Sequence, residues 1–392
     1  MYLYYCILGS ICLESLIYLD NSATTKPCET ALCYMNRAMT ESWGNPSSRH
    51  RLGMDAETLL REARSAAAAV LHCRDDEIIF TGSGTEANNT AVFGAARKNR
   101  KRGNRIVTTL IEHPSVAKPL ELLEQEGFEI VRLRPQKNGC VTPEQLRQAI
   151  TENTVLVSMM LVNNETGAIQ PVRAAAEIIR QKKSPAFLHC DAVQAFGKLP
   201  ISVDALGVDL LSASGHKIHA AKGIGLLYLK KGLRIPPFVL GGGQESGMRS
   251  GTEPTPLIAS LLGALKELPD PKTTLPKIQE LWDYARDRFA VNGAAINSAE
   301  GCLPYILNIS VLGYRSETLL NALNERGICV SSGSACSKGK LSTVLSESGL
   351  SDKRVDSALR LSFSRETTRA EIDRTAEALT EITQTMRKAY TT

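Results

Sequence analysis

The lysine at position 217 is the residue of this sequence with the clearest chemical potential. It follows the apolar run at 210–212 in the order Leu-Leu-Ser-Ala-Ser-Gly-His-Lys, so a buried strand would deliver it into a turn at Gly215. Burial and neighbouring cations disfavour a charged lysine, and a Schiff base with an aldehyde requires the uncharged amine. Ser214 and His216 add groups that bind phosphate. Alone, the segment is weak evidence, because most lysines that follow a strand are solvated.

A second segment offers an anion site. Residues 81–86 read Thr-Gly-Ser-Gly-Thr-Glu, after an apolar run and at the start of a helical pattern. Backbone N–H groups at a helix N-terminus are free to bind an anion, and the helix dipole favours negative charge there. The segment lacks the third glycine of a dinucleotide fingerprint and the Gly-Lys-Ser/Thr of a P-loop. It therefore predicts a site for a simple phosphate.

Three polar residues follow other predicted strands. Asp191 comes directly after the strand 186–190, where it either keeps a pyridine nitrogen protonated or caps a helix, and both remain open. Gln194 would reach the same ligand from the first turn of the helix that we expect after Asp191. His113 ends another strand, and its ring could lie flat against an aromatic ligand, although a lone histidine there is more often only a polar end residue.

A cysteine in a small, polar loop is the last candidate. Residues 331–340 read Ser-Ser-Gly-Ser-Ala-Cys-Ser-Lys-Gly-Lys, whereas structural cysteines are normally buried among apolar neighbours. A free thiol with a pKa of about 8.5 is only a few per cent thiolate at pH 7, and Lys338 and Lys340 would raise that fraction. Composition alone leaves a nucleophile and an incidental thiol equally open for Cys336.

Short apolar runs alternate with helical patterns between residues 77 and 230, which is typical of a parallel sheet covered by helices. Seven strands are predicted, at 77–80, 105–110, 128–133, 155–161, 187–190, 210–212 and 225–229, with helices at 85–100, 114–127 and 172–183 among those between them. The polar motifs in this region each follow a strand. Ligands of α/β sheets bind at that position, beyond the carboxyl ends of the strands.

A glycine- and proline-rich stretch at 236–256 interrupts this alternation, and such loops are more often functional than connective. Further strands at 305–311, 327–330 and 358–362 predict a smaller α/β domain. We expect a large domain at 17–260, a small domain at 261–392 that carries Cys336, and a non-core extension at 1–16. About the first fifteen core residues are expected to join the small domain.

Composition narrows the functional classes. The 392 residues are 43% hydrophobic and 22% charged, as in an ordinary folded protein. The net charge of +5 is too small to imply nucleic-acid binding, and the one basic stretch, 97–105, is interpreted as a helix end. Ten cysteines show neither metal-ligand nor disulfide spacing, so we expect no metal and a reducing cytoplasm. The apolar segment 1–16 is too short to span a membrane, with a signal peptide as the alternative to a simple extension.

Together the motifs resemble the group I cysteine desulfurases of the NifS/IscS type, pyridoxal 5′-phosphate enzymes of the class-V aminotransferase family. The similarity runs from residue 18 to about 372. It is carried by Tyr-Leu-Asp-Asn-Ser-Ala-Thr-Thr at 18–25, Gly-Asn-Pro-Ser-Ser at 44–48, Glu-His at 112–113, Val-Asn-Asn-Glu-Thr-Gly at 162–167, Asp-Ala-Val-Gln at 191–194, Ser-Gly-His-Lys at 214–217, Arg-Ser-Gly-Thr at 249–252 and Ser-Ser-Gly-Ser-Ala-Cys at 331–336. One departure is Ala-Ala at 220–221, where the family usually has Gly-Pro.

The resemblance implies a fold-type I α/β enzyme, with a seven-stranded, mostly parallel sheet in the large domain and a smaller C-terminal α/β domain. Lys217 would bind the cofactor aldehyde, His113 would stack on the ring and move protons, and Cys336 would become the persulfide. The cofactor would be held by Gly84, Thr85, Ser214 and His216 at the phosphate, Asp191 at the pyridinium, Gln194 at the phenolic oxygen, Asn164 at the ring, and Thr252 from the other subunit of a dimer. Asn45, Asn164 and Arg360 would bind the substrate, with Arg360 on its carboxylate.

The implied reaction converts L-cysteine to L-alanine and passes the persulfide sulfur to an acceptor protein of iron–sulfur cluster assembly or tRNA thiolation. The resemblance also implies a cytoplasmic homodimer that binds neither a membrane nor nucleic acid directly. One alternative is a selenocysteine lyase or another pyridoxal-phosphate lyase or aminotransferase of this fold, but those reactions need no mobile thiol such as Cys336. A sulfur-relay scaffold without catalysis is the other, and it has no use for Lys217, Asp191 and His113 together.

Overall fold

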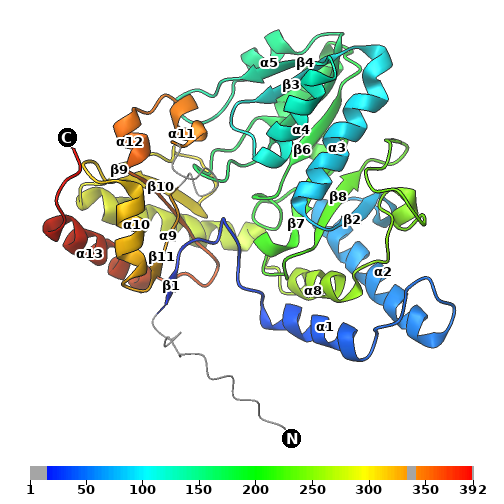
Figure 1. Cartoon of the computed structure of the whole chain (residues 1–392), viewed down its shortest axis with the longest axis horizontal. Helices are drawn as coiled ribbons and strands as arrows, with labels where there is room; N and C mark the ends of the chain where they lie inside the picture. The colour runs from blue at the N-terminus through cyan, green and yellow to red at the C-terminus, as the bar shows by residue number, and fades with distance from the viewer. Residues whose placement is uncertain (1–15, 333–340, 391–392) are drawn as a thin grey trace, which may run out of the picture.

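A computed structural model describes residues 16–332 and 341–390 of the chain. Its largest sheet has seven strands in the order β2-β8-β7-β6-β5-β3-β4 (Figure 1). They are β2 (Ile78–Thr81), β3 (Arg105–Thr109), β4 (Glu129–Leu133), β5 (Thr154–Met160), β6 (Phe187–Asp191), β7 (Leu210–Ser214) and β8 (Gly225–Leu229). Only β8 runs antiparallel to its neighbours. The seven predicted strands and the mostly parallel α/β class are therefore confirmed, with small shifts at the strand ends.

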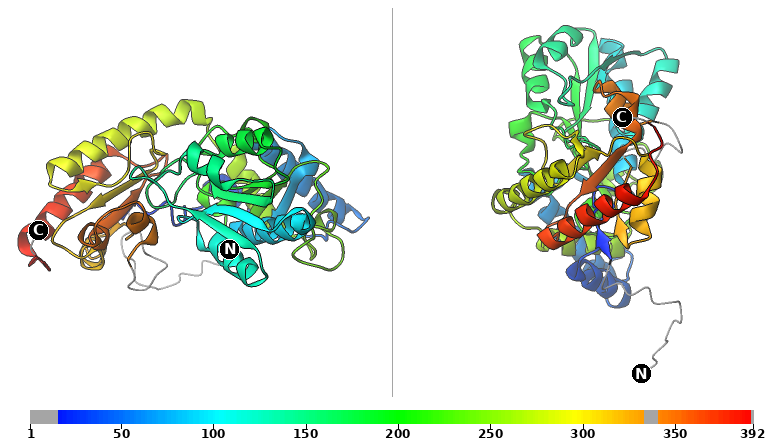
Figure 2. Two further views of the ribbon diagram at one scale, coloured as in Figure 1. Left: turned by 90° about the horizontal axis from the view of Figure 1, so that it is seen from above. Right: turned by 90° about the vertical axis from the view of Figure 1, so that its left-hand side faces the viewer.

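The strands are apolar because helices cover both faces of this sheet (Figure 2). Every residue of β5 is buried, as is typical of parallel sheets. Neighbouring residues of a strand pack into different cores, since side chains alternate between the two faces. Ile78 and Phe80 belong to the core that includes α2 (Arg51–Leu71) and α8 (Thr255–Lys266), whereas Ile79 belongs to the core that includes α3 (Gly84–Asn99) and α4 (Pro114–Gln125).

The other helices of this unit are α1 (Glu29–Thr40), α5 (Pro143–Ala149), α6 (Val172–Gln181) and α7 (Val203–Leu206). The helix predicted at 172–183 is thus α6. No helix within residues 16–332 and 341–390 has both the length and the apolar character needed to cross a bilayer.

A second unit is built on a three-stranded antiparallel sheet in the order β12-β10-β9. Its strands are β9 (Ala295–Ile296), β10 (Ile306–Ser310) and β12 (Ala358–Ser362), and its helices are α9 (Pro271–Val291), α10 (Ser316–Asn324), α11 (Thr343–Glu347), α12 (Asp352–Asp356) and α13 (Arg369–Thr385). The large side chains Trp282 and Phe289 of α9 fill its core. The strands predicted at 305–311 and 358–362 are confirmed, while the short β9 was not predicted.

The first described strand of the chain joins this second unit. β1 (Ile17–Tyr18) pairs in parallel with β11 (Ile328–Cys329), the strand predicted at 327–330, and Leu19 is fully buried in the same core (Figure 1). A bridge from Asp20 to Ser362 continues the contact. The segment after β1 then crosses to the first unit, where it meets the turn that follows β7. The division at residue 260 stays a prediction, and α8 spans that position.

The glycine- and proline-rich loop at 236–254 is anchored by a buried ion pair. Arg64 donates from Nη2 to Glu245 Oε1 at 2.7 Å, and Glu245 Oε2 also accepts from the backbone N–H of Phe80 at 2.8 Å. The Glu245 side chain is only 2% exposed, so this pairing is shielded from solvent. The loop is therefore attached to α2 and β2 rather than hanging freely from the sheet.

The basic stretch at 97–105 ends a helix, as predicted. Arg100–Arg102 form a short 3-10 turn after α3, and Gly103 follows. Arg97 pairs with Glu126 at 2.6 Å, and Arg105 pairs with Glu129 at 2.9 Å. The charges are thus partly neutralised by neighbouring carboxylates.

Close packing of α1 against α8 depends on Gly263. A Cβ at this position would lie 2.5 Å from the carbonyl oxygen of Thr30 and 2.7 Å from Ala31 Cα, closer than van der Waals contact allows. We expect Gly263→Ala to lower the free energy of unfolding by about 1–3 kcal/mol, because the helices must separate to admit the methyl group. Urea denaturation of the variant and the wild type measures the difference. Equal stability would show that α1 shifts without penalty.

Candidate active site

Lys217 stands at the centre of a polar cluster beyond the carboxyl end of β7. It ends the 3-10 turn Gly215–Lys217, which follows β7 without a gap. A Cβ at Gly215 would lie 2.9 Å from Ile224 Cγ2, so the tight turn favours glycine. Lys217 Nζ donates to the backbone carbonyls of Ser22 at 2.5 Å and Ala23 at 2.8 Å. The segment that follows β1 therefore supplies acceptors to the lysine on which the chemistry was predicted to depend.

Asp191, the last residue of β6, presents a buried carboxylate to this cluster. Its Oδ1 accepts from the backbone N–H of Val193 at 2.9 Å, and its Oδ2 accepts from Asn88 Nδ2 at 2.7 Å. Burial raises the pKa of Asp191, while these two hydrogen bonds and the nearby His113 and Lys217 oppose the rise. A cationic ring nitrogen beside this carboxylate would add a favourable charge of the opposite sign.

The helix expected after Asp191 is absent, and that prediction is wrong. Residues 192–199 form successive turns, in which the amides of Ala195 and Phe196 both donate to the carbonyl of Ala192. Gly197 follows with a φ of 72°, a left-handed conformation that ends the turns before a helix forms. The helix N-cap interpretation of Asp191 is therefore excluded.

Gln194 lies within these turns rather than in the first turn of a helix. Its Nε2 donates to the backbone carbonyl of Ser22 at 3.0 Å, which places it beside the acceptors of Lys217. Its Oε1 is buried without a hydrogen-bond partner among the described residues. Such a group costs free energy unless a ligand supplies the missing donor, so Gln194 marks a place where a ligand hydroxyl fits.

His113 begins α4 as its N-cap, whereas we predicted that it ends a strand; β3 already ends at Thr109. Its Nδ1 accepts from the backbone N–H of Ser115 at 3.1 Å and lies 2.7 Å from Ser115 Oγ. Because Nδ1 accepts, the neutral ring carries its proton on Nε2. Burial lowers the pKa of His113, Lys217 lowers it further, and Asp191 opposes them. The ring is therefore suited to hold or release a proton at Nε2.

Asn88 and Ser115 connect Asp191 to His113. Both are buried, and neither was predicted from the sequence. Asn88 is 1% exposed, and its Nδ2 donates both to Asp191 Oδ2 at 2.7 Å and to Ser115 Oγ at 2.8 Å. Ser115 Oγ in turn lies 2.7 Å from His113 Nδ1. A continuous chain of hydrogen bonds therefore orients both the carboxylate and the imidazole. An asparagine inside a predicted helix, where its propensity is low, is the signal that could have identified Asn88.

Replacing the Ser115 hydroxyl tests this chain. Ser115→Ala should raise the pKa of His113, because the ring loses a donor that favours its neutral form. A hydrogen bond of about 1 kcal/mol corresponds to a rise of less than one pH unit, and the backbone N–H of residue 115 remains. An NMR pH titration of the His113 ring measures the change. Ser115→Thr keeps the hydroxyl and is the control, and an unaltered pKa in Ser115→Ala would show that the hydroxyl does not donate to the ring.

The predicted phosphate segment forms the turn between β2 and α3. Gly84 opens α3, and a Cβ there would lie 2.8 Å from Val193 Cγ2 and 3.2 Å from Ser214 Cβ. Only glycine lets the helix start approach the ends of β6 and β7 this closely. The structure thus brings Gly84 and Ser214 together, with Thr85 next to them and exposed. The backbone N–H groups at this helix start have the character of an anion site.

Glu86 fastens the phosphate segment to the loop at 236–254. Its Oε2 accepts from the backbone N–H of Gly82 at 3.0 Å, and its Oε1 accepts from Arg249 Nε at 3.0 Å. Arg249, the first residue of the Arg-Ser-Gly-Thr motif at 249–252, is therefore attached to the helix start of the same chain.

His216 adds an uncharged ring to this cluster. Its Nδ1 lies 3.2 Å from Thr24 Oγ1. Burial lowers the pKa of His216 to about 4, with further lowering by the cations Lys217, Lys222 and Lys198. Near neutral pH the ring therefore binds through hydrogen bonds rather than as a cation.

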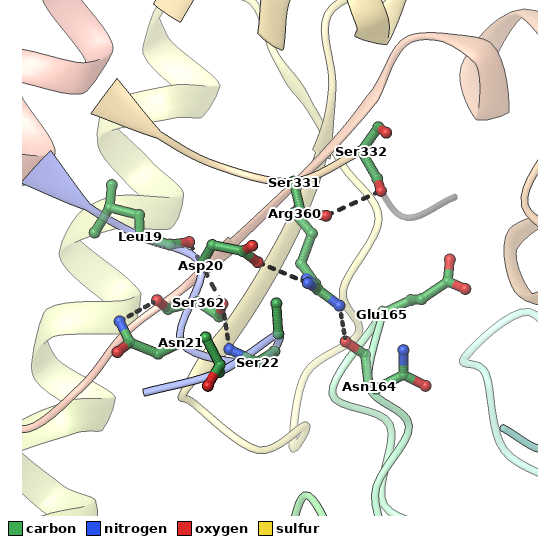
Figure 3. Close-up of polar contacts among 12 residues, drawn as sticks. Leu19, Asp20, Asn21, Ser22, Asn164, Glu165, Ser331, Ser332, Arg360 and Ser362 are labelled. Carbon is green, nitrogen blue, oxygen red and sulfur yellow. Dashed lines mark hydrogen bonds and ion pairs between the residues drawn. The ribbon is translucent and has the colours of Figure 1, made fainter. Parts of the chain in front are cut away.

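Arg360, in the middle of β12, brings the two units together (Figure 3). Its Nη2 donates to Asp20 Oδ1 at 2.7 Å, and its Nη1 donates to the backbone carbonyl of Asn164 at 2.9 Å. The side chain is 6% exposed, and its Nε has no hydrogen-bond partner within the described parts of the chain. The cation is thus oriented by Asp20 and by the loop after β5, and it retains an unused donor.

Cys336 lies outside the described residues, but both ends of the segment that carries it are described. Ser331 pairs through its backbone with Arg360, at 3.1 and 2.6 Å. Ser342 donates from Oγ to Glu165 Oε2 at 2.5 Å (the Glu165 side chain is drawn in Figure 3). Burial raises the pKa of Glu165 to about 7, opposed by Ser342 and Arg360. Ser331 therefore lies beside Arg360 itself. Ser342 contacts Glu165, which is next to Asn164, whose carbonyl accepts from Arg360.

Two predicted site residues are not joined to the cluster by a contact between described residues. Asn45 is exposed, and its Oδ1 accepts from the N–H of Ser47 in its own loop at 2.9 Å. Thr252 is exposed as well, and its side chain makes no hydrogen bond within residues 16–332 and 341–390. Their roles remain predictions.

Removing the partner of Arg360 tests how much this ion pair stabilises the fold. We expect Asp20→Ala to lower the free energy of unfolding by about 3–5 kcal/mol, because it leaves a buried guanidinium without its counter-charge. Arg37→Ala, which breaks the exposed pair with Glu41, is the control and should change stability by less than about 1 kcal/mol. Guanidinium denaturation measures both. A loss in Asp20→Ala no larger than in the control would show that solvent compensates Arg360.

Comparison with known proteins decides the family. The sequence profile of the family described as "Aminotransferase class-V" matches residues 17–375. The chain belongs to this family. The resemblance noted from the motifs is confirmed, and so is the fold-type I architecture.

Named relatives and solved structures agree with this assignment. "Cysteine desulfurase IscS" of Methanosarcina thermophila is 39% identical over 380 residues, which cover 95% of this chain and 93% of that protein. "Putative cysteine desulfurase IscS 1" of Bacillus subtilis is 39% identical and covers 93% and 98% of the two chains. A solved structure named "NIFS-like protein" superposes with a TM-score of 0.89 at 34% identity, over 95% and 100% of the chains. Another, "SspA in complex with cysteine", has a TM-score of 0.79 at 31% identity, over 90% and 100%.

Proposed function

We propose that the protein is a cysteine desulfurase that uses pyridoxal 5′-phosphate to convert L-cysteine to L-alanine, with the sulfur retained as a persulfide on Cys336. The observation that carries this proposal is the convergence of Lys217, Asp191, Gln194 and His113 at the carboxyl ends of β6 and β7 and the start of α4. The relatives named cysteine desulfurase support the substrate and the reaction type.

The donor set fits the cofactor. Asp191 offers a buried carboxylate to a pyridinium nitrogen, and the unpartnered Oε1 of Gln194 offers an acceptor to a ring hydroxyl. Gly84 opens a helix next to Ser214, where N–H groups suit a phosphate. When bound, the cofactor supplies an electron sink for the bonds broken at the substrate α-carbon and β-carbon.

Lys217 and His113 have the proton-transfer roles. Lys217 Nζ, which donates to the carbonyls of Ser22 and Ala23, would hold the cofactor through its aldehyde, and the same amine would take and return a proton at the bound substrate. His113 would present Nε2, since its Nδ1 is occupied by Ser115. Arg360 would hold the substrate carboxylate through its unused donor, oriented by Asp20.

Cys336 would take the sulfur. Its thiolate attacks the sulfur of the bound substrate, the S–S bond forms as the C–S bond breaks, and the electron pair of that bond stays with the carbon skeleton, which leaves as L-alanine after protonation. The persulfide then passes to a thiol of an acceptor protein of iron–sulfur cluster assembly or tRNA thiolation. The same fold supports a selenocysteine lyase, but such a reaction has no need of Cys336.

A homodimer in the cytoplasm is also proposed. The arginine of the 249–252 motif lies at the phosphate segment, while Thr252 is exposed, so it is available to a second subunit. Trp43, at 64% exposure, and Leu240, at 81%, are large apolar side chains that a dimer interface would cover. The described cysteines are free thiols, which suits a reducing compartment.

The Cys336→Ser variant distinguishes a desulfurase from other enzymes of the fold. The variant should bind cofactor and change its absorbance when L-cysteine is added, because neither step needs the thiol. It should form almost no alanine, since a serine hydroxyl is far less acidic and far less nucleophilic toward sulfur. Absorbance spectra and an alanine assay measure the two steps. Cys33→Ser, which alters an exposed thiol on α1, is the control with normal turnover.

Turnover of L-cysteine by Cys336→Ser near the wild-type rate would make Cys336 a bystander, and a simple lyase would then be the better assignment.

Lys217→Ala should lose both the cofactor absorbance of the bonded lysine and alanine formation. Normal alanine formation by that variant would contradict the role of Lys217.

A further inference from the structure

A second lysine lies buried behind Lys217. Lys198 lies in the last of the turns after β6 and is 7% exposed. Its Nζ has no hydrogen-bond partner among the described residues, and its nearest aromatic contact is the Tyr305 ring, 5.5 Å from Nζ to the ring centre. Buried ammonium groups are normally paired with an acid or with several carbonyls. No role in the proposed reaction accounts for this lysine.

Lys198 borders a small cavity that Lys217 also lines. The cavity has a volume of about 30 Å³, enough for a group of a few atoms. Its lining includes four basic side chains, Lys198, Lys217, His219 and Arg365, and no acidic one. The rest of the wall includes the apolar residues Leu268 and Phe363 and the hydroxyl residues Thr25 and Ser364. The cavity is therefore positively charged and partly shielded from water.

The basic groups around the cavity differ in how far they are already compensated. Arg365 donates to Glu267 Oε2 at 2.8 Å, so its charge already has a carboxylate partner. His219 Nδ1 lies 2.9 Å from the carbonyl of Lys26, and burial lowers the pKa of His219, so that ring is uncharged near neutral pH. Lys217 donates to two backbone carbonyls and also interacts electrostatically with the Asp191 carboxylate. The amine of Lys198, by contrast, has no hydrogen-bond acceptor in the described parts of the chain.

The charge state of Lys198 therefore depends on what occupies the cavity. Burial lowers the pKa of Lys198 to about 7, and the cations Lys217 and Arg360 lower it further. The neighbouring histidines, His216 and His219, are uncharged at that pH and do not offset this repulsion. An anion in the cavity would favour the protonated amine and raise the pKa of Lys198 again.

We propose that this cavity is a binding site for a small monovalent anion, a carboxylate or a halide, held by Lys198. The side chain supplies the charge and the donors, and the small volume of the cavity excludes larger anions. This site goes beyond the proposed desulfurase reaction, because it requires neither the cofactor nor Cys336. It would still influence the catalytic lysine, since a bound anion adds negative charge to a cavity that Lys217 lines.

Thermal unfolding of the full-length protein tests the site. The probes are sodium formate and sodium chloride, each compared at equal ionic strength with sodium gluconate, whose anion is too large for the cavity. At pH 6 we expect formate to raise the wild-type midpoint by about 1–3 °C with saturation, as binding to the native state alone predicts. The rise should fade by pH 9, where the unbound amine of Lys198 is neutral. Lys198→Met should show no rise at either pH.

Lys222→Met is the matched control, because it removes an exposed lysine near His216 that does not line the cavity. It should keep the formate effect. A rise with formate alone assigns the site to carboxylates, and a rise with chloride as well assigns it to small anions in general. Equal midpoints in formate and gluconate would overturn the proposal, as would an equal rise in Lys198→Met. The outcome is independent of whether L-cysteine is turned over.

Discussion

The ion pair between Arg360 and Asp20 is the interaction on which the geometry of the site depends. Three segments far apart in sequence meet on this guanidinium: the stretch after β1, the loop after β5, and β12 itself. The same stretch after β1 then supplies the carbonyls that Lys217 and Gln194 use. Since a buried cation tolerates few alternative arrangements of its partners, one pairing holds the two units in register across the site.

Burial favours the uncharged form of several titratable groups in and around this site. The pKa of Glu112 rises to about 8 and that of Glu165 to about 7, while the pKa of His216 falls to about 4, each mainly through burial. Each shift favours the uncharged form of the group. Burial raises the pKa of Asp191 as well, but its hydrogen bonds to Val193 and Asn88 and the nearby His113 and Lys217 oppose that rise. A ligand that carries charges of its own, such as a phosphate or a pyridinium, therefore meets a site with few competing ions.

The strands of the large sheet could be predicted from the sequence because each has a recognisable local pattern of apolar residues. Continuous apolar runs such as β5 have no polar face, and this pattern predicts a strand of a parallel sheet that is buried on both sides. Lys217 and Asp191 could be identified because they directly follow such runs. The prediction of a helix after Asp191 was wrong for a local reason as well. The apolar residues there suit a helix, but Gly197, with a φ of 72°, ends the turns.

The residues that the sequence did not reveal are those whose partners lie far away along the chain. Asn88 bonds Asp191 across 103 positions, and Asp20 bonds Arg360 across 340. Each is an ordinary polar residue in its own neighbourhood, and only folding shows that it orients a group that does chemistry. The β1–β11 pairing is of the same kind, because the strand at 327–330 could be predicted from its local pattern but its pairing with the distant Ile17–Tyr18 could not.

The placement of the predicted sulfur-carrying segment follows from the same division between a rigid frame and long-range contacts. Ser331 at one end pairs with the backbone of Arg360, and Ser342 at the other donates to Glu165, which is adjacent to the Asn164 carbonyl that Arg360 uses. These two contacts fix the described ends of the segment without using the guanidinium donors of Arg360, which go to Asp20 and Asn164. Under the proposed function, the nucleophile on this segment would have to reach a bound substrate first and an acceptor protein afterwards. Two fixed ends beside Arg360 would favour the first of these encounters, because holding a reactant near its target raises its effective concentration there.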